Sequence, residues 1–353
     1  VILPVGISFY TFQTMSYSLD IYFKKLKPTR DFISFASFVS FFPQLVAGPI
    51  VRASHLLPQL LSKRVFKYDQ GVQGLRLILW GLFKKVVIAD SLAWRVNYSF
   101  ENYHTLDGGT LLLGLIYFSI QIYCDFSGYS DIAIGTAKLF GINIRTNFNF
   151  PYFSRDIGQF WRRWHISLSS WFRDYLYIPL GGSKRSQWTS IRNIFIIFIV
   201  SGFWHGANWT FIVWGLTHAL LYIPLFLIGK NRKYTTNVVA ENNWFPSIKE
   251  LFQIGMTYFS TTIAWVFFRS ENISSSFKYL NSMILKFSIP LDNRGGITYI
   301  LLLICFDLFL LKNNNEMLEI NFFISRWAFY IVILFLIYLH INLETSEFIY
   351  FQF

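Results

Sequence analysis

The residue with the clearest chemical potential is His205, which lies in the longest apolar run of the chain, from about Ile191 to Gly229. An ionisable side chain deep in apolar sequence is costly and is usually functional. On a helix, Gly202 and Gly206 would form a groove that admits another backbone, with His205 beside it. Neutral imidazole is well matched to taking a proton near pH 7. We therefore predict that His205 is a general base, the alternative being a histidine that only packs against a neighbouring helix.

Two polar residues flank His205 at helical spacing. Asn208, three residues on, would lie about 60° round the same helical face, where its amide could fix the tautomer of the imidazole. Asn208 could also donate a hydrogen bond to the oxyanion that forms when an acyl group is attacked. Ser201, one turn before His205, is an alternative nucleophile that would carry the acyl group covalently.

A second histidine, His165, lies on a basic segment rich in aromatic residues. At 100° per residue the apolar side chains fall within an arc of about 100°; they are Trp161, Trp164, Leu168, Trp171, Phe172 and Tyr175. The pattern predicts a helix at the membrane interface, with this stripe buried and the arginines in the headgroup layer. His165 lies about 20° beyond the stripe, where it either faces a cavity or fills a seam. Arg162 and Arg163 either bind the phosphates of a donor or anchor the helix.

The other histidines have simpler interpretations. His218 follows His205 by thirteen residues, about 140° away on a continuous helix, so it is expected to be a core histidine unless the chain bends. His104 lies in a polar loop and is expected to be solvated. His340 lies in the last turn of an apolar segment, an interfacial position that needs no function.

Two carboxylates, Asp125 and Asp131, lie between an apolar run at 111–124 and another that reaches Phe140. Either they line a polar cavity, or they belong to a break at which Ser127 or Ser130 caps the next helix. The spacing does not decide between these interpretations. Two carboxylates are also too few to indicate a metal site.

Composition places the chain in a membrane. Of its 353 residues, 54% are hydrophobic and only 14% are charged, as in membrane proteins. The net charge of +12 is then assigned to cytoplasmic loops that face anionic lipid, and no nucleic-acid partner is expected. The chain has no nucleotide-binding loop, hydrolase elbow or paired-cysteine metal motif, which argues against kinase and hydrolase functions. We expect no metal and no tightly bound cofactor.

The hydrophobic segments predict an all-α polytopic membrane protein with about nine such segments and no soluble domain. They lie at 1–23, 32–51, 71–90, 111–124 with a second run that reaches 140, 191–229 (two helices), 251–268, 297–311 and 326–342. The segment at 32–51 has basic residues on both sides and is broken by Pro43 and Pro49, which predicts a re-entrant or broken hairpin. We expect 1–353 to form a single membrane-embedded domain that lacks N-terminal helices, because the chain opens on Val1 without a start methionine.

Several motifs together resemble the membrane-bound O-acyltransferase (MBOAT) family. They are WHGANW at 204–209, FWRRWHISL at 160–168, DYLYIPLGG at 174–182 and QIYCDFSGY at 121–129. The stretches LPVGISF at 3–9 and FPQLVAGPI at 42–50 resemble the bacterial alginate O-acetyltransferase branch more than the D-alanyl-transfer branch. The resemblance extends in order to FIYFQF at 348–353. As a set these motifs are far more specific than any one of them.

The resemblance implies a fold, a site and partners. The fold is a bundle of helices with re-entrant and interfacial helices around a central tunnel. The hallmark histidine of the family corresponds to His205 and its supporting histidine to His165. The donor is acetyl-coenzyme A or another acyl thioester on the cytoplasmic side, and the acetyl group ends on an exported polysaccharide, often through periplasmic partner proteins. The resemblance thus implies a bacterial inner-membrane protein.

The sequence therefore favours an O-acetyltransferase that acts on an alginate-like surface polysaccharide, with His205, His165 and Asn208 as catalytic residues. Arg162 and Arg163 are the candidates for donor binding. One alternative is a D-alanyl or other acyl transferase of the same family. Another is a lipid or polysaccharide transporter in which buried histidines relay protons, and a third is a structural scaffold for secretion partners.

Overall fold

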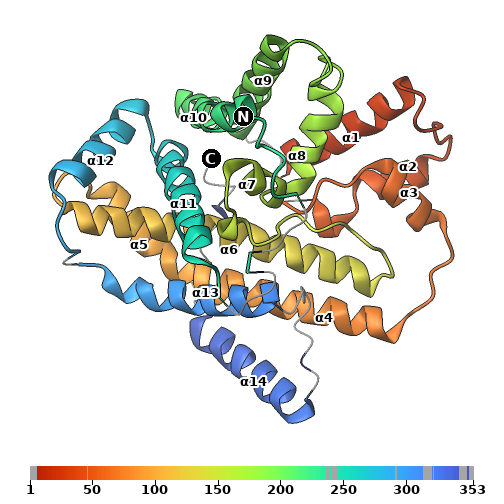
Figure 1. Cartoon of the computed structure of the whole chain (residues 1–353). Helices are drawn as coiled ribbons and strands as arrows, with labels where there is room; N and C mark the ends of the chain where they lie inside the picture. Colours follow the sequence, from red (N-terminus) through yellow and green to blue (C-terminus); the bar gives the residue numbers. More distant parts are fainter. Residues whose placement is uncertain are drawn as a thin grey trace.

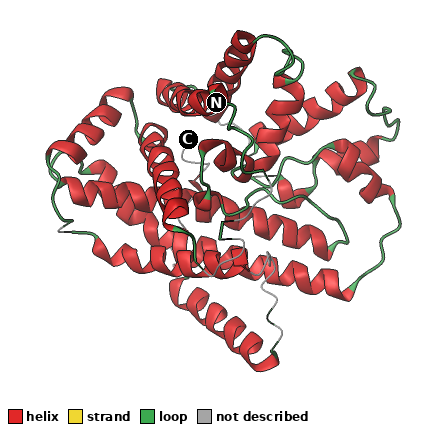
Figure 2. Cartoon of the chain, viewed as in Figure 1, coloured by secondary structure: helices red, strands yellow, loops and turns green. Residues whose placement is uncertain are grey.

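The computed structural model describes residues 6–45, 47–235, 239–240, 245–290, 292–312, 320, 322–341 and 348–349. Within these ranges every regular element is a helix (Figure 2), which confirms the predicted all-α class. Five helical segments are long and apolar enough to cross a membrane; they are Gly108–Leu139, Trp209–Leu227, Ile248–Arg269, Arg294–Leu311 and Phe323–His340.

The centre of the fold is an antiparallel pair of long helical segments (Figure 1). One is α6, Gly108–Leu139, most of which is buried. The other runs without interruption through α4 (Tyr68–Leu82), the π-helical segment η2 (Phe83–Ala89) and α5 (Asp90–Glu101). Short π-helical insertions in α-helices are rare and often occur at functional sites.

Glycines allow these two segments to touch along their backbones. A Cβ atom on Gly74 would lie 2.6 Å from the carbonyl oxygen of Gly135, and one on Gly81 would lie 2.5 Å from that of Gly128. Close approach through small residues is a common way to pack helices in membranes, where burial of apolar surface provides little driving force. The glycines therefore hold the charged residues of η2 against α6.

The N-terminal part confirms that 32–51 is not one crossing helix. It contains α1 (Ile7–Tyr22), α2 (Phe32–Val39), the 3₁₀ turn η1 (Phe42–Gln44) and α3 (Ala53–Leu61). Pro43 stands in η1, where the pattern breaks, as expected from a residue without a backbone donor.

The basic segment around His165 is not the single interfacial helix that the sequence pattern predicted. It forms α7 (Ile157–Arg163), α8 (Ile166–Phe172) and the π-helical turn η4 (Arg173–Tyr177). The break falls at His165, whose φ of 43° is left-handed. Most of the aromatic stripe is buried, as predicted, but Arg163 is only 9% exposed and does not lie in a solvent-facing layer. Tertiary packing has overridden the helical periodicity here.

The C-terminal half confirms the remaining predicted segments, which form α9 (Gln187–His205), α10 (Trp209–Leu227), α11 (Ile248–Arg269), α13 (Ile297–Lys312) and α14 (Phe323–His340). The structure adds a helix that was not predicted, α12 (Ile273–Leu285), and 3₁₀ turns at η3 (Pro151–Phe153) and η5 (Arg294–Gly296). In Figure 1 the α12–α13 connection lies at the left edge, whereas the α1–α2 and α3–α4 connections lie at the right edge. The backbone N–H of Gly108 donates to the Lys286 carbonyl at 2.8 Å, so the start of α6 lies at the same end as the α12–α13 connection.

The structure decides between the two interpretations of Asp125 and Asp131. Helix α6 continues through Ser127 and Ser130, so neither serine caps a new helix and that interpretation is wrong. Instead, the Asp131 carboxylate pairs with the Lys84 ammonium at 2.7 Å, and Asp125 pairs with Lys85 at 2.8 Å. Both lysines come from η2, so each carboxylate of α6 meets a cation of the facing segment.

Candidate active site

His205 is the last residue of α9, and the chain turns at Gly206 before α10 begins. Its ring packs edge-on against Trp214 of α10 and Phe268 of α11, with centroid distances of 5.1 and 5.0 Å. The ring of Trp204 also packs edge-on against the His205 ring, with a centroid distance of 4.7 Å. The imidazole therefore sits in an aromatic pocket built by three helices.

Close packing of α9 on α10 positions His205. A Cβ atom on Gly202 would lie 2.2 Å from the Phe211 carbonyl oxygen, and one on Gly206 would lie 2.4 Å from the Phe211 ring. The predicted small-residue groove is confirmed at Gly202, although Gly206 lies beyond the end of the helix.

We predict that Gly202→Ala destabilises the protein by about 1–3 kcal/mol, because backbone atoms of the facing helix must move to admit the new methyl group. Thermal unfolding in detergent measures this effect. Gly255→Ala is the matched control: Gly255 lies in α11 with no atom near its would-be Cβ, and alanine is the better helix former. Equal melting temperatures for the two variants would contradict the proposed packing.

His165 is held by Asn147, a residue that the sequence reading did not single out. The His165 Nδ1 atom lies 3.2 Å from Asn147 Oδ1, which also accepts bonds from the backbone N–H and the hydroxyl of Ser167. Because the amide oxygen can only accept, Nδ1 carries the proton and Nε2 keeps its lone pair. Nε2 is buried with no partner among the described residues. The predicted supporting histidine thus presents a basic nitrogen.

Burial keeps this imidazole neutral. His165 is 1% exposed and its ring packs edge-on against Phe126 at 4.7 Å. Burial, and then the nearby His205 ring, lower the pKa of His165 well below its ordinary value. A neutral ring can accept a proton from a substrate, which a permanently protonated one cannot.

The two histidines share one site although they are forty residues apart in sequence. Trp204 lies between them, with ring centroids 6.2 Å from His165 and 4.7 Å from His205. The indole N–H groups of Trp204 and Trp214 are buried without a hydrogen-bond acceptor among the described residues. Buried donors are normally satisfied, so these groups mark a place where a substrate or water completes the hydrogen bonding.

Asn208 does not have the position that the sequence pattern predicted. It caps α10: its Oδ1 accepts from the Thr210 backbone N–H at 3.1 Å, and its Nδ2 donates to the Glu271 carbonyl at 2.8 Å. The prediction assumed one helix through His205 and Asn208, but α9 ends at His205. Both polar atoms of the Asn208 side chain are engaged in joining α10 to the α11–α12 connection, which leaves its predicted catalytic role without structural support.

The chain does bend after His205, so His218 lies closer to the site than its spacing suggested. Its ring is fully buried and lies edge-on to Trp214, at 5.0 Å, and to Trp161, at 4.9 Å. Trp214 therefore contacts both His205 and His218. Neither ring nitrogen of His218 has a partner among the described residues. His218 is a core residue, as predicted, but it belongs to the shell around the site.

The two candidate donor-binding arginines have different surroundings. Arg162 lines a cavity of about 450 Å³ between α7–α8 and α9–α10, which also contains Arg173, Arg232 and Ser201. Its guanidinium donates to the Asn231 and Tyr234 carbonyls at 2.8 and 3.1 Å. The cavity thus reaches from three arginines to Ser201, one turn from His205.

Arg163 does not line that cavity. Its Nη1 is buried without a partner among the described residues. Burial, with Arg155 and Arg162 nearby, lowers the pKa of Arg163 to about 10. An unpaired buried guanidinium among other cations would be stabilised by an anion.

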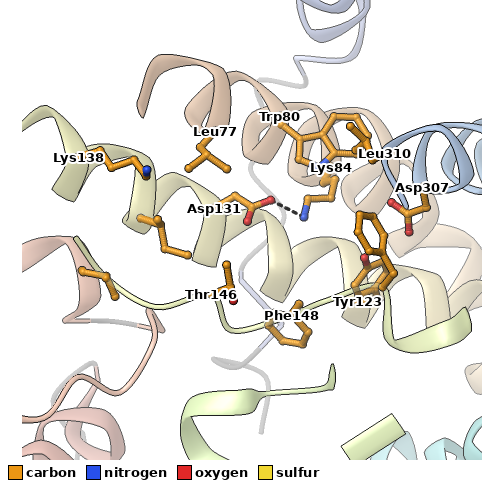
Figure 3. A pocket seen from close by; sticks show the side chains of 13 residues that line it. Leu77, Trp80, Lys84, Tyr123, Asp131, Lys138, Thr146, Phe148, Asp307 and Leu310 are labelled. Atoms are coloured by element: carbon orange, nitrogen blue, oxygen red, sulfur yellow. Dashed lines mark ion pairs between the residues drawn. The ribbon is translucent and has the colours of Figure 1, made fainter. Parts of the chain in front are cut away.

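A second cavity, of about 220 Å³, is lined by α4, η2, α6 and α13 and contains a charged cluster of Lys84, Asp131 and Asp307 (Figure 3). The Lys84 ammonium bonds to Asp131 and, at 2.8 Å, to the Ser127 hydroxyl. Asp307 of α13 faces the same space, and its Oδ1 is buried without a partner among the described residues. Phe148 lines this cavity and stacks on the His165 ring at 6.4 Å, so one aromatic ring separates the charged cluster from the histidine site.

The described part of the C-terminal tail packs on the same core. The Ile349 backbone N–H donates to Asp125 Oδ2 at 2.7 Å, and Phe348 packs against Tyr129 at 5.4 Å. Asp125 therefore links η2, α6 and the tail. The sequence contained no pattern that indicated this contact.

The chain belongs to the family described as MBOAT, membrane-bound O-acyltransferase, whose model matches residues 24–236. It is 40% identical over 283 residues to a probable alginate O-acetylase, AlgI, of Pseudomonas aeruginosa, covering 80% of this chain and 52% of that protein. It is 38% identical over 309 residues to the peptidoglycan O-acetyltransferase of Helicobacter pylori, covering 80% and 57%. It is 30% identical over 257 residues to the teichoic acid D-alanyltransferase of Bacillus subtilis, covering 69% and 62%. The chain thus spans about half to two thirds of the length of these relatives. The predicted family and the multi-pass membrane character are confirmed.

Proposed function

We propose that this chain is the core of a bacterial inner-membrane O-acetyltransferase, which moves an acetyl group from a cytoplasmic thioester such as acetyl-coenzyme A to a hydroxyl of an exported polysaccharide. The observation that carries the proposal is the pair of imidazoles around Trp204, of which His165 is buried and His205 partly exposed, beside unpaired indole N–H donors. The acetylases among the relatives support the acyl chemistry.

The chemistry needs one base and a set of donors. The acceptor oxygen attacks the acetyl carbonyl carbon while His205 takes the hydroxyl proton. The tetrahedral oxyanion then collapses, the C–S bond breaks with its electron pair on sulfur, and the imidazolium returns the proton to the thiolate. The products are an acetyl ester and a free thiol, and His205 is neutral again.

Three side chains fit supporting roles. The indole N–H groups of Trp204 and Trp214 are placed to donate to the oxyanion, the role first assigned to Asn208. His165, with Nε2 unpaired, serves as the second catalytic or tunnel-lining residue. Direct transfer needs no acyl-enzyme on Ser201.

The cavity at Arg162 fits the donor. Its arginines suit the phosphates of a coenzyme A donor, and its apolar walls lead to Ser201. Arg163, buried and unpaired at Nη1, adds positive potential. The basic loops at that end of the cavity support a cytoplasmic location for the cavity under the positive-inside rule. Periplasmic partner proteins would take part in the transfer of the acetyl group to the polysaccharide.

We predict that Arg162→Ala raises the KM for acetyl-coenzyme A by about 10- to 100-fold with a smaller effect on kcat, because a charge-assisted hydrogen bond contributes about 1.5–3 kcal/mol. Initial rates in membrane vesicles measure this. Arg64→Ala, an exposed cation in the α3–α4 connection, is the control. An unchanged KM in Arg162→Ala would remove this residue from donor binding.

One observation favours a second candidate, a proton-coupled transporter: the charged cluster of Lys84, Asp131 and Asp307 is buried among helices, as proton relays often are. A transporter would move its substrate without changing it covalently. Mass spectrometry of surface glycans from cells with and without the intact gene separates the two functions. Loss of O-acetyl groups supports the transferase, whereas unchanged acetylation contradicts it.

A further inference from the structure

A polar recess of about 390 Å³ opens at the end of the bundle where α5 and α11 finish and α12 begins. Its lining includes Glu101, Tyr103, His104, Arg269, Glu271 and Ser275. The volume lies in the range of about 300–1,000 Å³ typical of small-ligand pockets.

The recess adjoins His205 through two direct links. Phe268, which packs on the His205 ring at 5.0 Å, immediately precedes Arg269 of the recess wall. Asn208, three residues after His205, donates to the Glu271 carbonyl at 2.8 Å. The wall of the recess is therefore connected, through Phe268 and Asn208, to the turn that carries the candidate base.

Charge distribution places the recess on the side away from the cytoplasm. The stretches 24–30, 62–67 and 184–185 contain nine Lys or Arg residues and no Asp or Glu, and by the positive-inside rule they face the cytoplasm. Helix α9 begins just after the last of these stretches and ends at His205. The α5–α6 connection at 102–107 contains no Lys or Arg. In Figure 1 the α12–α13 connection lies opposite the first two basic stretches.

The walls combine aromatic faces with hydrogen-bonding groups. The rings of Tyr103 and His104 lie 3.8 Å apart, and Phe100 stacks on Tyr279 at 4.5 Å behind them. A pyranose ring presents both an apolar C–H face and an edge of hydroxyl groups, so it matches a wall of this kind, with aromatic area and a few placed polar groups.

Two carboxylates in the recess, those of Glu101 and Glu271, can accept hydrogen bonds from a ligand. Among the described residues neither the Glu101 nor the Glu271 carboxylate accepts a hydrogen bond or forms a close ion pair, although both interact electrostatically with Arg269, and both side chains are exposed. The Arg269 guanidinium is held by Asn97 at 2.8 Å and stacks over Phe100. Carboxylates accept hydrogen bonds from sugar hydroxyls, and the guanidinium can donate to them.

The charges of the recess indicate which sugars fit. The lining has two carboxylates and one guanidinium, and Lys286 at the rim donates to the His104 carbonyl at 2.7 Å. With Lys286 counted, the charges balance, so a polyanionic chain gains no net attraction and meets two exposed carboxylates.

We propose that this recess binds an uncharged pyranose unit of the acceptor glycan and presents its hydroxyl to the histidine site. The proposal rests on the proposed transferase function and narrows its acceptor to neutral sugars or N-acetylated amino sugars, rather than uronates. Glu101 and Glu271 act as specificity residues that bind hydroxyl groups and repel carboxylated sugars.

Binding of soluble oligosaccharides to the purified full chain in nanodiscs tests the proposal. The probes are N-acetylglucosamine tetramer, cellotetraose and a tetramer of mannuronate, each followed by saturation-transfer NMR. We expect saturable binding of a neutral tetramer, at least tenfold weaker binding of the uronate, and at least tenfold weaker binding of neutral tetramers by the Glu101→Gln, Glu271→Gln double variant. Asp292→Asn, which removes an exposed carboxylate at the same end outside the recess, is the matched control and should bind like the wild type.

The outcomes separate this proposal from the transferase itself. Acetyl-coenzyme A consumption with a small alcohol as acceptor should be the same in the double variant as in the wild type. If no form consumes the donor, the transferase function fails, while the binding measurement still reports on the recess. The recess proposal is overturned if the wild type binds no neutral tetramer, if the double variant binds it equally well, or if the uronate binds more tightly.

Discussion

Replacing His205 with alanine should reduce acetyl transfer by about 10²- to 10⁴-fold, the usual contribution of a positioned general base. The protein should remain folded, because its small-residue contacts are made by Gly202 and Gly206 rather than by the ring. The loss should appear in kcat, since the base acts on the acceptor hydroxyl in the transition state and not on the bound donor. Single-turnover acetyl transfer in membrane vesicles measures it.

The control for this variant is His55→Ala. The Nε2 atom of His55 lies 2.9 Å from the Asn143 carbonyl oxygen. The His55→Ala substitution therefore removes an imidazole that is not part of the aromatic pocket around His205. Wild-type turnover by a folded His205→Ala protein would eliminate His205 as the base and make His165, whose Nε2 has no partner among the described residues, the next candidate.

The second large effect is expected for His165→Asn, with a fall in acetyl transfer of about 100-fold. Asparagine tolerates the left-handed backbone that His165 adopts at a φ of 43°, so this change removes the imidazole with little added strain. In a His165→Ala variant, the effect of losing the imidazole could not be separated from the effect of backbone strain at this left-handed position. Circular dichroism and acetyl transfer on the same preparation separate folding from chemistry.

Asn147 supplies a further test of the same role. Asn147→Leu removes the acceptor that fixes the proton on Nδ1 of His165, so both tautomers become accessible and kcat should fall with little change in the KM for the donor. If His165→Asn is inactive while Asn147→Leu is fully active, tautomer control is not required. If both are fully active, His165 is only a packing residue.

Fold class followed directly from the sequence because burial in lipid requires long apolar helices, and such runs are visible by composition. The segments that became α11, α13 and α14 were predicted close to their observed bounds, and the proline-broken segment at 32–51 was predicted not to cross as one helix. The sequence did not show that the two apolar runs at 111–124 and up to Phe140 form one continuous helix, α6. Ion pairs with Lys84 and Lys85 neutralise Asp131 and Asp125, so α6 continues through a stretch that looked like a helix end.

The candidate site was predicted only in part. His205 and His165 stand out because imidazoles in apolar or aromatic sequence are rare, and the structure brings them to either side of Trp204. Asn147 was missed because a lone asparagine in a loop carries no periodic signal. Asn208 was misplaced because spacing arguments assume a continuous helix, whereas the chain ends α9 at His205 and uses Asn208 to cap α10.

The sequence by itself determined that this is a helical membrane protein with imidazoles inside its apolar core, since hydropathy and residue type are local properties. Only the tertiary structure decided which polar groups meet. The unpaired Nε2 of His165, the indole N–H groups beside His205 and the recess at Glu271 all depend on contacts between helices distant in sequence. Such contacts are set by packing of whole helical faces, which no local pattern specifies.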